Sequence, residues 1–220
     1  ERRYKVKLVI GNKNYSTWSL RPWLLLSAFD IDFEEIQESL ISEGLKERLK
    51  KYSPTCRVPV LIDGTKRIWD SLAICEYVSE KYLNGRGWPE NLELRAEARM
   101  VTCEMHSGFV ALRNELPMNC RAIRKVEISP AAEDDISRID SIWSECTQKY
   151  SYIGPWLFGE FSIADCFFAP VALRFATYGV PLSNYANQYS KLLRNHKCMI
   201  NWVESAKAET EIVVEDEAGI

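Results

Sequence analysis

The chain has 220 residues, enough for one large domain or two small ones, and its 46% hydrophobic content can form a packed core without disulfides. Its net charge of −3 carries no electrostatic signature of nucleic-acid binding, and no apolar run approaches the roughly 18 residues of a membrane span. The seven cysteines include no CxxC pair and the two histidines no metal-binding spacing, so we expect a cytoplasmic protein without a disulfide framework or a metal.

The first part of the chain alternates strand and helix patterns. Residues 1–3 are charged and lack the apolar core of a signal peptide. Apolar residues alternate with lysines from Tyr4 to Ile10 and predict a strand, and the apolar spacing over 20–31 predicts a helix whose start tolerates Pro22. A second strand is expected over 33–40, followed by a short exposed helix over 42–53.

A hairpin and a third helix follow. Residues 58–62 predict a buried strand, and Asp63-Gly64 is a hairpin turn signal before a return strand that reaches Trp69. A proline at the start of a strand suggests a cis Val58–Pro59 bond, which would leave Val58 free to pair with a bound peptide. The apolar stripe that begins at Asp70-Ser71 predicts a helix whose N-terminus suits a carboxylate ligand.

The rest of the chain has helical patterns only. Turn-forming residues over 84–89 indicate a linker, and helical spacing predicts one continuous helix over 92–116 and another over 136–150. Ser162 and Asp165 have the spacing of a capping box before a further apolar helix. The acidic end, 211–220, is expected to be a solvated tail. Together the patterns predict an α/β region followed by an all-α region.

The turn from Tyr15 to Ser19 is the first candidate site. Helix N–H groups and the helix dipole favour an anion there, and the hydroxyls of Ser16, Thr17 and Ser19 add donors. If the anion is a thiolate, one good hydroxyl donor can lower its pKa by about one unit from the free value of roughly 8.5. The residues alone also allow these hydroxyls to serve only as helix caps.

Three motifs, in this order, resemble the cytosolic glutathione transferase family over nearly the whole chain. The segment Ser16–Arg21 looks like the zeta-class serine motif Ser-Ser-Cys-Ser-x-Arg. Residues 57–61 look like the family's cis-proline strand, and residues 70–74 look like the acidic-serine segment that holds the γ-glutamyl group. The capping box at Ser162 matches a folding element of the family. The resemblance therefore implies a thioredoxin-like glutathione-binding domain and a helical domain with an acceptor pocket.

This resemblance implies boundaries of 1–83 and 90–220 for the two domains, with glutathione as co-substrate. Ser16 would be the catalytic residue that stabilises the glutathione thiolate. The implied glutathione-binding residues are Arg57, Val58, Pro59, Asp70 and Ser71. The alternates for the role of Ser16 are Tyr15, Thr17 and Ser19, and the candidate acceptor-pocket residues are Arg113, Arg121 and Arg174. We interpret Cys56 as an ordinary buried cysteine, and the absence of a cysteine at the Ser16 position disfavours a thiol-exchange mechanism.

One departure bears on the substrate. The zeta class carries an arginine well inside the helix after the capping box, and the matching position falls near Thr177, whereas this chain has Arg174. We therefore favour a conjugating transferase that acts on an electrophilic small molecule over a glutathione-dependent isomerase of the maleylacetoacetate type. A non-catalytic binding module is the alternative from another class. Because the family pairs as twofold dimers, the resemblance also implies a homodimer.

Overall fold

The structure, a computed structural model, describes residues 5–220, so residues 1–3 and Tyr4, at the head of the predicted first strand, lie outside it. Its elements in chain order are β1 (Val6–Ile10), α1 (Thr17–Ala28), β2 (Phe33–Gln37), α2 (Leu45–Lys50), β3 (Val60–Asp63), β4 (Lys66–Trp69), α3 (Ser71–Leu83), α4 (Leu92–Ser107), α5 (Val110–Glu115), α6 (Pro130–Lys149), α7 (Ile163–Tyr178), α8 (Asn184–Arg194), α9 (Lys197–Ala208) and the short helix η1 (Val214–Asp216).

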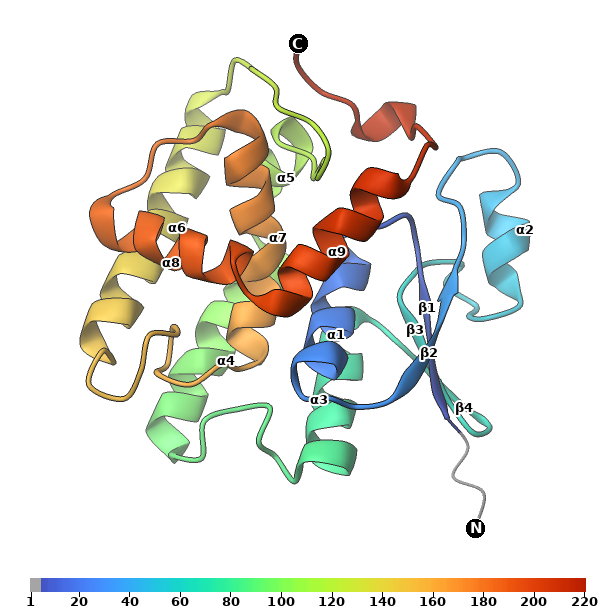
Figure 1. The fold of residues 1–220 in the computed structure, drawn as a ribbon, viewed down its shortest axis with the longest axis horizontal. Coiled ribbons are helices and arrows are strands. Elements are labelled where there is room, and N and C mark those ends of the chain that lie inside the picture. Colours follow the sequence, from blue (N-terminus) through green and yellow to red (C-terminus); the bar gives the residue numbers. More distant parts are fainter. Residues whose placement is uncertain (1–4) are drawn as a thin grey trace.

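A four-stranded sheet organises the first region, with strand order β2-β1-β3-β4. Strand β1 runs parallel to β2 and antiparallel to β3, which is antiparallel to β4. Helices α1 and α3 lie between the sheet and the rest of the molecule, and α2 stands on the far side of the strands (Figure 1). The predicted thioredoxin-like α/β region is therefore confirmed.

The second region consists of helices, with α7 at its centre. This helix packs against α1, α4 and α8, and nearly all of its side chains are buried. Because its sequence is apolar on every side, burial among neighbours is the arrangement that the hydrophobic effect favours. The predicted all-helical region is thus confirmed, and within residues 5–220 no helix has the length and apolarity that crossing a membrane requires.

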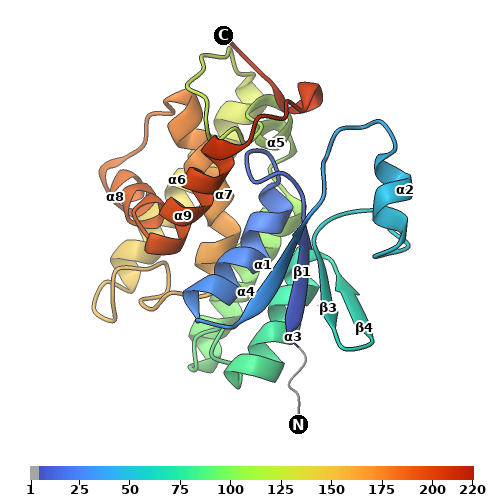
Figure 2. The same cartoon turned by 45° about the vertical axis from the view of Figure 1, so that its right-hand side comes forward.

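The two regions share one hydrophobic core. The buried cluster extends from Leu8 in β1 and Leu24 in α1 to Trp143 in α6 and Phe167 in α7. Helix α1 packs directly against α7 and α9, as the two views in Figures 1 and 2 show. The chain passes between the regions in the connection from α3 to α4, and we propose that the domain boundary, with domains of 1–83 and 90–220, lies there.

The predicted continuous helix over 92–116 is wrong. Helix α4 ends at Ser107 and α5 begins at Val110, because Gly108 is extended and Phe109 adopts a left-handed conformation with φ of 58°. The break turns Phe109 into the core, where it is 8% exposed. Leu92 and Met100, in the first half of the predicted 92–116 pattern, are 70% and 67% exposed, whereas Met105, Leu112 and Leu116 are buried. Only the second half of that pattern therefore marks a buried face.

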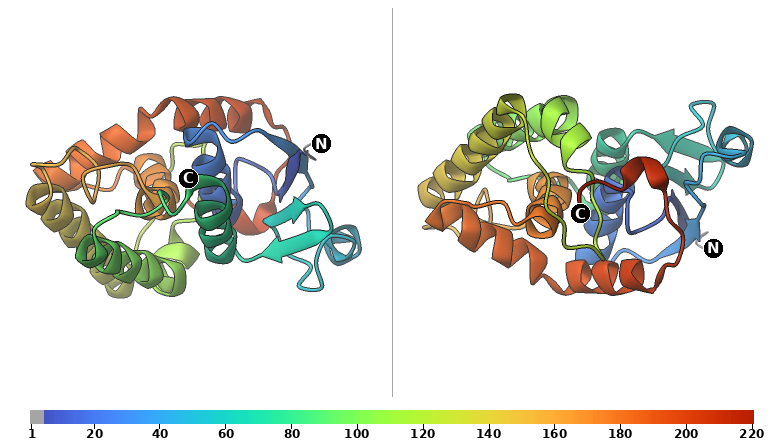
Figure 3. Two further views of the ribbon diagram at one scale, coloured as in Figure 1. Left: turned by 90° about the horizontal axis from the view of Figure 1, so that it is seen from below. Right: turned by 90° about the horizontal axis from the view of Figure 1, so that it is seen from above.

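The C-terminal segment, residues 209–220, includes the acidic end over 211–220. That end is not the solvated tail that its acidity suggested, because the Glu211 carboxylate accepts a hydrogen bond from Asn12 Nδ2 (2.8 Å). The carboxylate of Glu209 accepts hydrogen bonds from the N–H groups of Lys13 (2.7 Å) and Asn14 (3.0 Å). Ile220 exchanges backbone hydrogen bonds with Lys125. Figure 3 (right) shows this segment near the start of α1. Its acidic side chains are ordered because they satisfy donors of the turn before α1.

Candidate functional site

Two adjoining pockets open beside the start of α1. The first, of about 300 Å³, is lined by residues that include Pro59, Asp70, Ser71 and His106. The second, of about 490 Å³, is lined by residues that include Tyr15, Ser16, Arg113, Arg174 and Asp216. The residues that line both pockets are Trp18, Arg57 and Val58. The three sequence motifs therefore meet at one cleft, although they lie far apart along the chain.

Ser16 caps α1 at the edge of the second pocket. The helix begins at Thr17, before the predicted start near Leu20, and Pro22 lies inside it. The Ser16 hydroxyl donates to Ser19 Oγ (2.7 Å) and accepts from the Ser19 N–H (3.4 Å). Ser19 is fully buried and its Oγ accepts the Gly11 N–H at 3.1 Å, so this hydroxyl ties α1 to the end of β1. Ser16 and Thr17 line the second pocket, whereas Ser19 does not.

Two guanidinium groups flank Trp18 in this turn. The Cζ atom of Arg21 lies 4.5 Å from the centroid of a Trp18 ring, and the Cζ atom of Arg113 lies 4.7 Å from one. Arg21 is fully buried, donates through Nε to the Phe167 carbonyl (3.3 Å), and has one terminal nitrogen without a partner among residues 5–220. Burial lowers the pKa of Arg21, and the neighbouring arginines lower it further. The turn therefore lies in a region of positive charge that favours anions.

The N-terminus of α3 contributes to the lining of the first pocket. The Val58–Pro59 bond is cis, which confirms the prediction. Asp70 Oδ1 caps α3 by accepting the N–H groups of Leu72 (2.9 Å) and Ala73 (3.2 Å). Ser71 is buried, and its Oγ has no hydrogen-bond partner in the described part of the chain. A helix N-terminus with an unused hydroxyl is suited to a carboxylate ligand.

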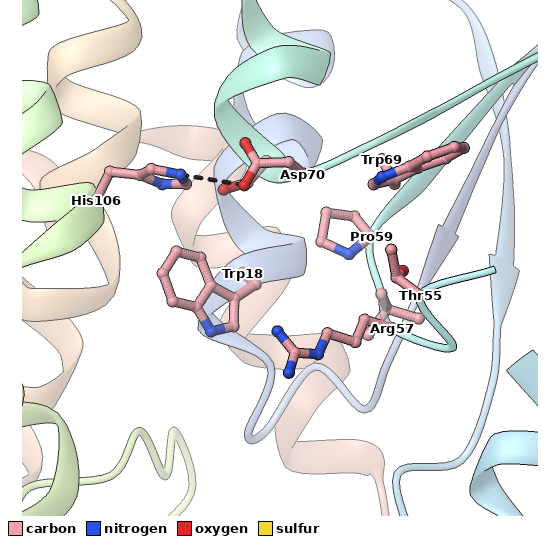
Figure 4. Close-up of a pocket in the computed structure, with 9 residues that line it drawn as sticks. Trp18, Thr55, Arg57, Pro59, Trp69, Asp70 and His106 are labelled. Carbon is pink, nitrogen blue, oxygen red and sulfur yellow. Dashed lines mark hydrogen bonds and ion pairs between the residues drawn. The ribbon is translucent and has the colours of Figure 1, made fainter. Parts of the chain in front are cut away.

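The sequence analysis missed His106, which α4 brings to the same end of the pocket. Its Nε2 lies 3.1 Å from Asp70 Oδ2, and Figure 4 shows the two side chains facing each other beside Trp18. Burial lowers the pKa of His106, and the charge of Asp70 opposes this only in part. Burial therefore favours the neutral form of this imidazole. The only sequence signal was one histidine outside any metal-binding pattern, and within residues 5–220 no group of three or more potential metal ligands occurs.

The three arginines predicted for an acceptor pocket separate in the structure. Arg113 and Arg174 both line the second pocket. The Arg174 guanidinium is buried and donates to the carbonyls of Arg113 and Leu116. Arg121 is not among the residues that line either pocket. It donates instead to the carbonyl oxygens of Glu209 and Glu211, because the ordered C-terminal segment offers these acceptors.

Tyr15 and Cys56 also differ from a simple interpretation of the sequence. The Tyr15 hydroxyl donates to Glu217 Oε1 (2.6 Å) and accepts from Arg121 (2.9 Å), and burial raises its pKa. Its hydrogen is therefore already engaged by the C-terminal segment. Cys56, expected to be an ordinary buried cysteine, is half-buried with φ of 51° and lines the second pocket, because the loop before Pro59 turns it toward the cleft.

Comparison with known proteins agrees with this geometry. Residues 15–81 match the family model described as glutathione S-transferase, N-terminal domain. The maleylacetoacetate isomerase of Rattus norvegicus is 30% identical over 178 residues, with 77% of this chain and 79% of the relative covered. A probable maleylacetoacetate isomerase of Caenorhabditis elegans is 33% identical over 104 residues, with 46% of this chain covered. This match spans about half of the worm protein, 49% of its length.

A solved structure shares the fold. It is that of a glutathione transferase homologue from Burkholderia with bound glutathione, with a TM-score of 0.73 and 23% sequence identity. The match covers 94% of this chain and 100% of the other. The likeness extends over both the sheet region and the helical region, so the arrangement of the two regions is common to both proteins.

Proposed function

Because the chain belongs to the glutathione S-transferase family, and to its zeta-like members, we propose that it catalyses attack of the glutathione thiolate on an electrophilic small molecule. The observation that carries this proposal is the meeting of the Ser16 turn, the Val58–Pro59 bond and the Asp70-Ser71 helix start at one cleft. The Ser16 turn would bind the thiol of glutathione, the segment at Val58 its peptide backbone, and the start of α3 its γ-glutamyl group.

Glutathione would extend across both pockets. The α3 N-terminus and the Ser71 hydroxyl, which has no hydrogen-bond partner among residues 5–220, support binding of the γ-glutamyl carboxylate. The Asp70 carboxylate, which caps α3 and lies beside His106, would bind the ammonium group. The backbone of Val58 would pair with the peptide, and Arg57 lies where both pockets meet. The thiol would then reach the Ser16 turn in the second pocket.

Ser16 is the proposed catalytic residue. Its hydroxyl would turn from Ser19 to donate to the bound thiolate, in exchange for the hydrogen bond it makes now. The α1 N-terminus and the charges of Arg21 and Arg113 support the ionised thiol further. Thr17 remains an alternate donor, whereas the contacts of Tyr15 and Ser19 favour structural roles.

The second pocket would hold the acceptor. Arg57, Arg113 and Arg174 give its lining an excess of positive charge, which favours an electrophile that carries a carboxylate. A second candidate function is a glutathione-dependent isomerisation, in which the same thiolate adds to a double bond and is expelled after rotation. It is favoured by the presence of Arg174 in the pocket and by the two relatives named maleylacetoacetate isomerase. A screen that compares aryl halides with cis-enediones separates the two reactions.

Retention on immobilised glutathione tests the proposal. We expect the protein to be retained and to be released by free glutathione. The variant Ser71→Ala should be retained about tenfold more weakly, because a charge-assisted hydrogen bond to the γ-glutamyl carboxylate is worth roughly 1.5 kcal/mol. Ser141→Ala, at an exposed serine of α6, is the control. A wild-type protein that passes through the column would instead favour a non-catalytic binding module.

A further inference from the structure

The C-terminal segment brings an acidic residue to the acceptor pocket. Glu209 holds the beginning of this segment against Lys13 and Asn14, and Glu217 holds its end through the Tyr15 hydroxyl (2.6 Å) and Asn119 Nδ2 (3.0 Å). The short helix η1 lies between these anchors. Asp216, its last residue, therefore has a defined position and lines the second pocket.

Asp216 contributes the one carboxyl group among the described residues that line this pocket. The lining also contains Arg57, Arg113 and Arg174. The Arg174 guanidinium donates to two neutral carbonyl groups, so among residues 5–220 no carboxylate contacts it directly. Burial raises the pKa of Asp216 and lowers that of Arg174, and the charge of each group partly offsets this by favouring the ionised form of the other. Within the pocket, the Asp216 carboxylate offsets part of the positive charge of the three arginines.

We propose that Asp216 is a specificity-determining residue, which weakens the binding of anionic acceptors by competing with them for the positive charge of Arg174 and its neighbours. A carboxylate-bearing acceptor gains from the arginines and is repelled by Asp216, whereas a neutral acceptor of the same shape responds to neither. The ratio of the two affinities therefore depends on residue 216. This inference rests on the proposed function of the pocket, and it concerns only the discrimination between anionic and neutral acceptors.

The test compares two ligands that differ only in charge. Titration calorimetry would measure the dissociation constants of 3-nitrobenzoate and 3-nitrobenzamide for the full chain, with and without S-methylglutathione. Neither ligand has a leaving group, so binding is separated from catalysis. In Asp216→Asn, we expect affinity for the benzoate, relative to the benzamide, to rise about fivefold, as for one charge removed several ångströms away in a partly solvated site.

Two further variants distinguish position from net charge. Glu215→Gln removes the same charge from the adjacent, exposed residue outside the pocket lining, so the ratio should stay within about twofold of wild type. Asp216→Glu retains the charge and should also keep the wild-type ratio. An unchanged ratio in Asp216→Asn, an equal rise in Glu215→Gln, or failure of both ligands to bind would overturn the proposal. Turnover of 4-chloro-3-nitrobenzoate with glutathione, in which a C–S bond forms and chloride leaves, tests the proposed function separately.

Discussion

Ser16 has two hydrogen-bonding roles that a substitution can separate. As a cap, its oxygen accepts the Ser19 N–H at 3.4 Å, a long contact that contributes little to stability. As a donor, its hydroxyl now points to Ser19 Oγ and would be redirected to the thiolate. The fold should therefore tolerate loss of this hydroxyl much better than the chemistry does.

We accordingly predict that Ser16→Ala retains most of the glutathione affinity but raises the pKa of the bound thiol by about one unit, equivalent to roughly 1.4 kcal/mol. Absorbance of the thiolate as a function of pH measures this directly. Thr17→Val, which alters the neighbouring pocket residue, should leave the titration curve where it was. If Thr17→Val shifts the curve and Ser16→Ala does not, the donor is Thr17.

At the scale of elements, the N-terminus of α7 holds the helical region together. Asp165 and Ser162 form the predicted capping box, which the structure confirms. The Asp165 carboxylate accepts the N–H groups of Ser162 (2.9 Å) and Leu157 (3.3 Å) and the hydroxyl of Tyr189 (2.8 Å). All of these groups are buried, so α7, α8 and the preceding loop depend on one side chain.

Asp165→Ala should lower the free energy of unfolding by about 3 kcal/mol, because it removes a cap and leaves buried donors unpaired. Urea denaturation at pH 7 gives the value, with Asp134→Ala, at an exposed acid of α6, as the control. A loss below about 1 kcal/mol would mean that water satisfies these donors.

The pH dependence of this effect has a defined sign. Burial raises the pKa of Asp165 to about 6, so the folded state holds this proton more tightly than the unfolded state does. The stabilisation that the folded protein gains from holding the Asp165 proton is complete below pH about 4, near the ordinary carboxyl pKa. It is lost as pH rises to about 6. The stability of the wild type, measured relative to Asp165→Asn, should therefore fall over this interval.

For the whole molecule, we predict a homodimer in which each subunit has its own glutathione site. Leu92 and Met100 on α4 and Trp69 on β4 are large apolar side chains exposed to solvent, and such residues mark interaction surfaces when they gather on one face. A stable pair should bury at least about 1,200 Å² in total. Sedimentation at micromolar protein should show about twice the chain mass of 25.4 kDa. Met100→Glu should shift the equilibrium toward the monomer, whereas Ile123→Glu, at another exposed position, should not.

The signals that the sequence carried on its own were local ones. The Ser162 capping box, the Asp63-Gly64 hairpin and the proline before β3 each depend on residues a few positions apart, and each is found in the structure. The alternation of apolar residues in β1 and the apolar composition of α7 likewise identify buried elements, because periodicity and burial are linked directly. These signals were sufficient for the two-region fold, whereas the three motifs of the cleft were identified by their resemblance to the glutathione transferase family.

What only the tertiary structure decided is which distant groups meet. His106 reaches Asp70 from 36 positions away, and Glu217 reaches Tyr15 from 202 positions away. The acidity of residues 211–220 suggested solvation, yet the carboxylates of Glu211 and Glu217 accept hydrogen bonds from Asn12 and Tyr15, just before α1. The helix break at Phe109 likewise depends on the core that receives its ring. These contacts cannot be predicted from local sequence, because a charge or an aromatic ring has many possible partners. The packing of the whole chain determines which partner it contacts.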